Sequence, residues 1–171
     1  MTDRLAAEFQ AYDCANPDND PSNAPKDQPL IACDPSGQAK YLLGPTELTG
    51  DAITDASAGR DPRTGAWLVQ LTMNGDGAEA FGEVSTRLNQ NRLAELSPRD
   101  QFAFVLDGSV ISAPRMNGQI LDGRPSISGD FTQESATALA DQLKFGALPL
   151  SFEVQSSDTV SYTHLTLPTK A

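Results

Sequence analysis

The chain has 171 residues, enough for one domain with a substantial hydrophobic core. Its 23 acidic and 12 basic side chains give a formal net charge of -11, which argues against nucleic acid or an anionic lipid surface as a partner. No apolar run reaches the about 18 residues of a membrane span, and no basic region followed by an apolar one opens the chain, so the sequence predicts neither a transmembrane helix nor an export signal.

The first elements surround a polar loop. Residues 2–12 carry apolar side chains at helical spacing and predict a short amphipathic helix. Residues 16–29 are rich in Asp, Asn and Pro, a composition typical of a loop. The apolar runs PLIAC (29–33) and KYLLGP (40–45), separated by turn residues, predict a hairpin after that loop.

The two cysteines of the chain, Cys14 and Cys33, flank the polar loop. They lack the CxxC spacing and the nearby histidine of a zinc or redox site. A disulfide between them would stabilise the fold by about 3 kcal/mol through lost chain entropy, whereas the alternative is a buried pair of free thiols. We favour the disulfide, which would place the domain outside the cytoplasm.

A strand and a helix are predicted in the middle of the chain. Residues 51–61 are small and polar, and residues 60–65 (RDPRTG) form a turn. Residues 66–73 alternate apolar and polar side chains, as in a strand with one buried face. In the helix that follows, Asp76 is the expected N-cap and Glu79 its partner in a capping box.

Next comes a hairpin with a two-residue turn. FAFVL runs into Asp107–Gly108 and out through SVISA. Asp-Gly favours a type I′ turn, which would pair Val105 with Val110 and Phe104 with Ile111.

The remaining elements complete the fold prediction. A second hairpin is expected over residues 119–128, in which Pro125 marks the returning strand as an edge. Thr132 should cap a last helix that ends at Gly146, and LSFEV (150–154) should form the closing strand. This order predicts an α+β fold, with an antiparallel sheet backed on one face by two helices.

One pattern resembles a nucleotide site. Residues 75–80 match the dinucleotide fingerprint G-x-G-x-x-A after a predicted strand. Asp76, however, would put a carboxylate among the amides meant for pyrophosphate, and the next strand enters a hairpin. We therefore favour a glycine turn with an aspartate cap.

The acidic loop carries possible oxygen ligands for calcium, namely Asp18, Asp20, Ser22 and Asp27. An EF-hand loop requires Gly at its sixth position and Glu at its twelfth, where this chain has Asn23 and Pro29. A solvated acidic loop is favoured, and no cofactor or metal is expected.

Two aspartates are candidates for catalysis. Asp107 and Asp122 each stand in an LDG tripeptide and could form a glycosidase-like acid pair. Asp-Gly is also a strong turn signal, and a turn role is favoured for both. The single histidine, His164, lies in a polar tail, so no Ser-His or Cys-His pair is evident. A secreted carbohydrate-active enzyme and an extracellular calcium-binding module remain alternatives.

Taken together, several stretches over residues 30–161 resemble SecD, a subunit of the protein-export translocase, and its actinobacterial forms above all. The likeness is to the large extracytoplasmic domain. Its most specific parts are a hairpin motif, LDG-x-V-x-SAP, and the block G-x-FT-x-x-x-A-x-x-LA-x-x-L-x-x-GALP, which closes with the helix-end motif GALP. The hairpin motif comprises Leu106, Asp107, Gly108, Ser112, Ala113 and Pro114. The helix-end motif comprises Gly146, Ala147, Leu148 and Pro149.

The resemblance implies a domain organisation. In SecD a ferredoxin-like base carries a mobile head, which would assign residues 1–65 to part of the head region and residues 66–156 to a portion of the base. Residues 157–171 would be a tail, and from about residue 161 they show no likeness to the family.

The resemblance also implies a function without catalysis. SecD pairs with SecF beside the SecYEG channel, as a multi-pass protein of the cell membrane, and uses the proton-motive force to assist export. The extracytoplasmic domain would bind unfolded exported polypeptide, at an exposed strand edge or an apolar groove. The candidates in this chain are residues 125–128 and the hairpin that bears Tyr41 and Leu42, although both side chains are also typical of a core.

Overall fold

A computed structural model describes residues 3–16, 18–145 and 150–159. Within these residues the fold is α+β, as predicted, and no helix combines the length and hydropathy needed to cross a bilayer. The helical elements are α1 (Asp3–Ala11), α2 (Gly75–Leu93), α3 (Gln133–Phe145) and the short 3₁₀ turns η1 (Pro21–Asn23) and η2 (Gly50–Ala52). The strands are β1 (Leu30–Cys33), β2 (Ala39–Thr49), β3 (Ile53–Arg60), β4 (Trp67–Met73), β5 (Phe102–Leu106), β6 (Ser109–Ser112), β7 (Ser126–Phe131) and β8 (Leu150–Thr159).

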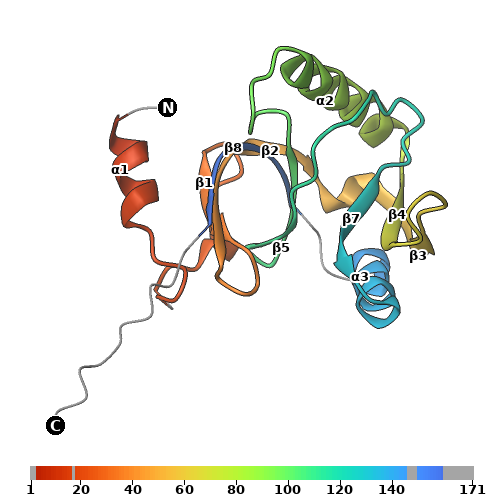
Figure 1. Ribbon diagram of the computed structural model, residues 1–171, viewed down its shortest axis with the longest axis horizontal. Coiled ribbons are helices and arrows are strands. Elements are labelled where there is room, and N and C mark those ends of the chain that lie inside the picture. Colours follow the sequence, from red (N-terminus) through yellow and green to blue (C-terminus); the bar gives the residue numbers. More distant parts are fainter. Residues whose placement is uncertain (1–2, 17, 146–149, 160–171) are drawn as a thin grey trace, which may run out of the picture.

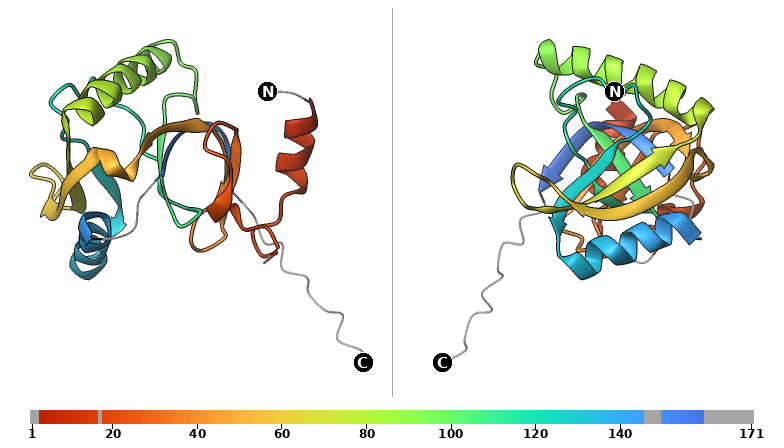
Figure 2. Two further views of the ribbon diagram at one scale, coloured as in Figure 1. Left: turned by 180° about the vertical axis from the view of Figure 1, so that it is seen from behind. Right: turned by 90° about the vertical axis from the view of Figure 1, so that its right-hand side faces the viewer.

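Where one sheet was predicted, the strands form two. β1, β2, β8, β5 and β6 close into a barrel, which lies between α1 on one side and the rest of the fold on the other (Figure 1). β3, β4 and β7 make an antiparallel three-stranded sheet. In the right-hand view of Figure 2, α2 and α3 run above and below these strands, with the barrel behind them.

Strand β5 is the wall that the two halves share. All five of its residues are buried, because alternate side chains enter different cores. Ala103 and Val105 face the barrel interior, while Phe102, Phe104 and Leu106 face the core between the barrel, the small sheet and the two long helices. The small sheet buries one face only, so Val69 and Leu71 of β4 are buried while Gln70 and Thr72 are exposed.

The start of α2 corrects one prediction. The N-cap is Asn74, whose side chain accepts a hydrogen bond of 2.7 Å from the amide of Gly77, and Asp76 lies inside the first turn. The predicted capping box is therefore wrong. A Cβ at Gly77 would lie 2.7 Å from that of Ala52, so this glycine permits close packing of the helix start against η2.

The predicted Asp107–Gly108 turn is confirmed. Both residues have positive φ, 49° and 77°, as a type I′ turn requires. Val105 pairs with Val110 as expected, but Phe104 pairs with Ser112 rather than with Ile111, because a bulge shifts the register by one residue.

The predicted hairpin over residues 119–128 is wrong. Its first half, up to the edge of β7, is a loop, and Ile127 of β7 pairs with Val69 of β4, far earlier in the chain. The small polar stretch at 51–61 instead contains β3, which pairs with β4 from the other side. The cap of α3 is as predicted, since the Thr132 hydroxyl accepts a 3.1 Å hydrogen bond from the Ser135 amide. Gly146 to Pro149 lie outside the described residues.

Candidate functional site

An apolar hollow of about 280 Å³ lies where the barrel meets the three-stranded sheet, and we call it the crevice. Its floor is aromatic: Phe81 contacts Phe102 edge to face with ring centroids 5.0 Å apart, and Phe102 contacts Phe104 in the same way at 5.2 Å. One wall is the loop 114–120, and the other is formed by Pro125, Ser126 and Ser128.

The wall formed by β7 is a strand edge. The amide of Leu71 donates a 2.9 Å hydrogen bond to the carbonyl of Pro125, so odd-numbered residues of β7 direct their backbone groups toward β4. Ser126 and Ser128 alternate with them, and their backbone N–H and C=O groups point away from β4. The crevice is therefore bordered by the backbone polar groups of an edge strand.

The wall formed by loop 114–120 is fixed at both ends. At one end the amide of Met116 donates to the carbonyl of Asp100 (2.8 Å), and the Arg115 guanidinium lies 3.5 Å from the buried Asp100 carboxylate. At the other end the buried Ser85 hydroxyl accepts from the Ile120 amide (3.0 Å) and also lies within hydrogen-bond distance of its carbonyl (3.3 Å). Short buried anchors thus hold the loop over the aromatic floor.

The hairpin motif leads from the barrel into the crevice. Ser112 donates its hydroxyl hydrogen to the backbone carbonyl of Ser128. Ala113 packs against the barrel core, and Pro114 lines the crevice while its carbonyl accepts a 3.1 Å hydrogen bond from the Phe102 amide. The end of the motif thus lies at the junction of the two sheets.

The two LDG aspartates lie against different elements. Asp107 is exposed in its turn, and Gly108 beside it packs against η1. Asp122 accepts a 3.1 Å hydrogen bond from the Arg124 amide in a separate turn, where Gly123 has a φ of 65° and packs against the start of α2. No hydrogen bond joins the two carboxylates within the described residues, and both act locally in turns.

The acidic loop likewise uses its side chains in local turns. Asp20 accepts the Ser22 amide at 2.9 Å, and the amide of Asp18 donates to the side chain of Asn16 at 3.0 Å. Within the described ranges, no three His, Cys, Asp or Glu side chains are grouped so as to hold a metal ion.

Of the two predicted binding segments, only one borders a hollow that suits a polypeptide. Leu42 is 1% exposed and Tyr41 packs partly buried against the barrel core, whereas residues 125–128 form a wall of the crevice. The aromatic floor was missed, because its rings come from α2 and β5 and each is typical of a core residue when the sequence is considered alone.

The predicted disulfide joins Cys14 to Cys33, with their Cα atoms 5.9 Å apart. It connects the loop after α1 to the last residue of β1, which also forms the parallel pair with Ser109 that closes the barrel. The bond therefore attaches the N-terminal segment to the barrel seam.

Known proteins are similar to this chain in sequence. Residues 27–150 match the family described as the P1 head subdomain of SecDF. The match extends over both sides of the predicted domain boundary at residue 65, and that boundary stays a prediction. The chain is 34% identical over 167 residues to protein translocase subunit SecD of Streptomyces coelicolor, covering 94% of this chain and 29% of that protein. It is 36% identical over 162 residues to the SecD of Mycobacterium tuberculosis H37Rv, covering 93% of this chain and 27% of that protein.

Two solved structures are similar to this chain in fold as well as in sequence. One, of a membrane component SecDF that enhances protein export, has a TM-score of 0.51 and 32% identity over 75% of this chain and 52% of that one. The other, SecDF in a super-membrane-facing form, has a TM-score of 0.52 and 33% identity over 74% of this chain and 15% of that one. The chain, which spans under a third of the length of these two curated relatives, belongs to the SecD family of protein translocase subunits.

Proposed function

We propose that this chain is part of the extracytoplasmic domain of a SecD subunit and binds unfolded polypeptide during export driven by the proton-motive force. In the intact protein it would act in the cell membrane with SecF and the SecYEG channel. Its contribution is to bind polypeptide and not to make or break bonds. The crevice carries this proposal.

The crevice joins two features that suit an extended chain of any sequence. The outward backbone groups of Ser126, together with the Ser128 carbonyl once the Ser112 hydroxyl releases it, can pair with the backbone of an added strand, which every polypeptide offers. The hollow beside Pro114 and Ile120, in front of the buried aromatic rings, can receive an apolar side chain from that strand. Affinity would then depend little on sequence, as an export factor requires.

The size of the crevice favours a side chain over a small-molecule ligand. Its volume of about 280 Å³ lies just below the range of roughly 300–1,000 Å³ typical of small-molecule sites. One large apolar side chain is a better match than a complete metabolite.

Gly118 allows a direct test. It lines the crevice, and a Cβ at this position would meet no atom within 4 Å, so the backbone has room for the first atom of a side chain. We expect Gly118→Phe to fill the crevice and weaken binding of a fluorescently labelled, permanently unfolded polypeptide about tenfold, measured by anisotropy. Gly118→Ala is the matched control, because a methyl group leaves the crevice open.

Equal affinity of Gly118→Phe and the unsubstituted chain, with both folded by circular dichroism, would show that the crevice is not the binding site. The same pair of substitutions in a full-length SecD tests the link to export: the Phe variant should slow the secretion of a reporter protein in cells, and the Ala variant should not.

A further inference from the structure

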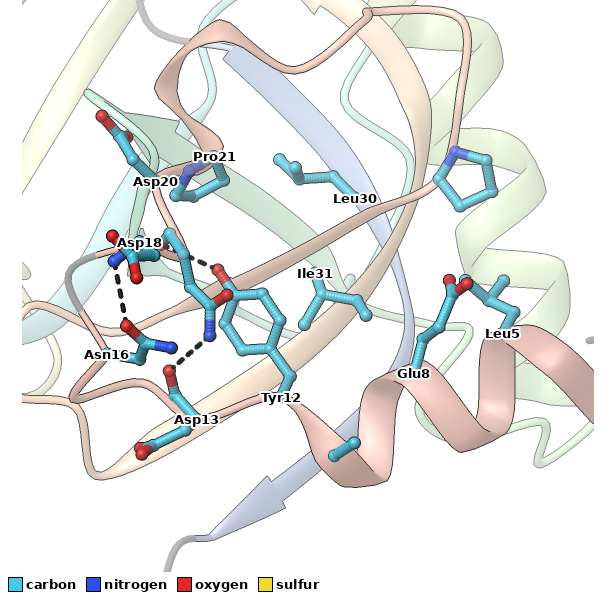
Figure 3. Close-up of a pocket in the computed structure, with 13 residues that line it drawn as sticks. Leu5, Glu8, Tyr12, Asp13, Asn16, Asp18, Asp20, Pro21, Leu30 and Ile31 are labelled. Atoms are coloured by element: carbon cyan, nitrogen blue, oxygen red, sulfur yellow. Dashed lines mark hydrogen bonds between the residues drawn. The ribbon is translucent and has the colours of Figure 1, made fainter.

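A second hollow, of about 600 Å³, lies between α1, the loop that follows it and the start of β1, and we call it the helix groove (Figure 3). Apolar side chains form its floor, among them Leu5, Tyr12 and Ile31. Carboxylates stand around them: Glu8 on the helix, and Asp13, Asp18 and Asp20 on the loop.

The helix wall of this groove is fixed by a lysine. The Lys40 ammonium of β2 lies 5.0 Å from the centroid of the buried Phe9 ring. It also donates hydrogen bonds to the carbonyls of Gln10 (3.1 Å) and Tyr12 (3.4 Å). A cation at the C-terminal end of a helix stabilises the last carbonyls, so Lys40 contributes to holding α1 against the barrel.

The loop wall is fixed by covalent and polar contacts. The disulfide ties Cys14 to β1. The Tyr12 hydroxyl donates to the carbonyl of Asn19 (3.1 Å), and the Asn19 amide group donates to the carbonyl of Asp13 (2.9 Å). Both walls are therefore held by contacts of the chain itself, and the groove does not need an occupant to keep its shape.

The charge of the groove is strongly negative. Glu8 pairs with the exposed Arg4 at 2.9 Å, but among the described residues no lysine or arginine forms an ion pair with the three loop aspartates. Burial raises the pKa of Tyr12, and the nearby Asp20 carboxylate raises it further, which is the effect expected of a negative field over the groove floor.

We propose that the helix groove binds a basic, apolar segment of an unfolded polypeptide. A leucine or aromatic side chain would lie on the floor beside Tyr12 and Ile31, and neighbouring lysine or arginine side chains would reach the carboxylates. The inference rests on the proposed function in taking unfolded polypeptide as the occupant, but it assigns a second site, built from other residues than the crevice.

Charge and shape both favour this occupant. The rim lacks the grouped ligands of a metal site within the described residues, and the net charge of -11 opposes nucleic acid and anionic lipid. An apolar floor with a carboxylate rim complements a peptide in which apolar and basic side chains alternate.

The probe is a labelled ten-residue peptide of alternating leucine and lysine with terminal serines, titrated into the full 171-residue chain. The rim variant combines Asp13→Asn, Asp18→Asn and Asp20→Asn, since asparagine keeps the oxygen that accepts the turn hydrogen bonds. The matched control variant, with the same change in net charge, combines three exposed sites elsewhere: Asp130→Asn, Glu134→Gln and Asp141→Asn.

Each exposed ion pair contributes about a factor of two, so the rim variant should bind the peptide about eightfold more weakly at low salt. The control variant should bind as the unsubstituted chain does. A peptide with glutamate in place of lysine should bind no more tightly to the unsubstituted chain than to the rim variant, because only the crevice would accept it. Ile31→Thr, which keeps a β-branched residue in β1, should weaken binding of the basic peptide several-fold.

Unchanged affinity of the rim variant would overturn the inference, and so would an equal loss in both variants, because that result indicates attraction by net charge alone. Gly118→Phe separates the two proposals: it should leave unchanged the part of the basic-peptide affinity that the rim variant loses. Loss of that part in Gly118→Phe would mean that the groove is not an independent site. If Gly118→Phe has no effect on binding of unfolded polypeptide, only the crevice proposal is contradicted.

Discussion

The hydroxyl of Ser112, at the end of β6, donates a hydrogen bond to the backbone carbonyl of Ser128 in β7. This contact joins the barrel to the edge of the three-stranded sheet beside the crevice. Because the Ser128 carbonyl points away from β4, the Ser112 hydroxyl occupies an acceptor that an added strand would use. The last part of the hairpin motif therefore competes with the proposed substrate.

Removing that hydroxyl should have two opposite effects. Ser112→Ala loses one hydrogen bond, so the free energy of unfolding should fall by about 1 kcal/mol and Tm by about 2–4 °C. The freed Ser128 carbonyl should at the same time strengthen binding of unfolded polypeptide, which anisotropy measures. Ser112→Thr keeps the hydroxyl and is the control. A lower Tm with unchanged affinity would assign the contact a purely structural role.

Substitutions in the Asp107–Gly108 turn distinguish a structural role of Asp107 from a catalytic one. Gly108→Ala should destabilise the chain by about 1–2 kcal/mol or more, because φ is 77° and the new Cβ would lie 2.9 Å from the Ser22 amide nitrogen. Asp107→Asn should leave stability within about 0.5 kcal/mol, since asparagine accepts a φ of 49° well. Urea unfolding measures both changes.

An export assay in cells provides the second half of this test. A full-length SecD with Asp107→Asn should export a reporter protein normally if the residue only turns the chain. Complete loss of export with the fold intact would indicate that the Asp107 carboxylate has a chemical role.

The turn between β3 and β4 should contribute to acid sensitivity. The Asp61 carboxylate accepts the amides of Arg63 (2.7 Å) and Thr64 (3.2 Å), and these bonds lower its pKa. Since the pKa is lower in the folded chain than in the unfolded one, this contribution is complete above about pH 4 and is lost as the pH falls through the folded value. Asp61→Asn should therefore flatten the fall of the unfolding free energy below about pH 4, measured by urea titrations.

The comparison for this acid experiment is Asp130→Asn. Asp130 is exposed and lies in β7, outside this turn, so its replacement tests whether the loss of any one negative charge has the same effect. An identical slope in all three proteins would show that the Asp61 bonds do not survive in solution.

Local patterns predicted the elements whose partners lie nearby in the chain. The hairpin around Asp107–Gly108 and the helix capped by Thr132 depend on turn and cap geometry that a few residues determine. β3 was missed because its side chains are small and polar, and it is a strand only because β4 pairs with it along its whole length.

Long-range pairing explains why the site itself was not predicted. Ile127 pairs with Val69, which are separated by the whole of α2 and the β5–β6 hairpin, so the neighbouring sequence predicted a hairpin that does not form. The crevice brings together Phe81 of α2, Phe104 of β5 and Ser126 of β7. Only the division of the strands into two sheets makes these three residues neighbours, and no spacing in the sequence encodes that division.

The disulfide should support the helix groove more than the crevice. Cys14 and Cys33 are 19 positions apart, and opening a loop of that size should lower the free energy of unfolding by about 3 kcal/mol and Tm by about 6–12 °C. With the loop wall released, the basic peptide should bind far more weakly, while unfolded polypeptide should still bind at the crevice, which lies on the other side of β5 from the barrel interior. Thermal unfolding and the two binding assays, each with and without reductant, measure these effects.

The double variant Cys14→Ser, Cys33→Ser should behave as the reduced chain does and should not respond to reductant. Equal Tm and equal basic-peptide affinity in the oxidised, reduced and substituted proteins would mean that Lys40 and the Tyr12 hydroxyl hold the groove without the disulfide.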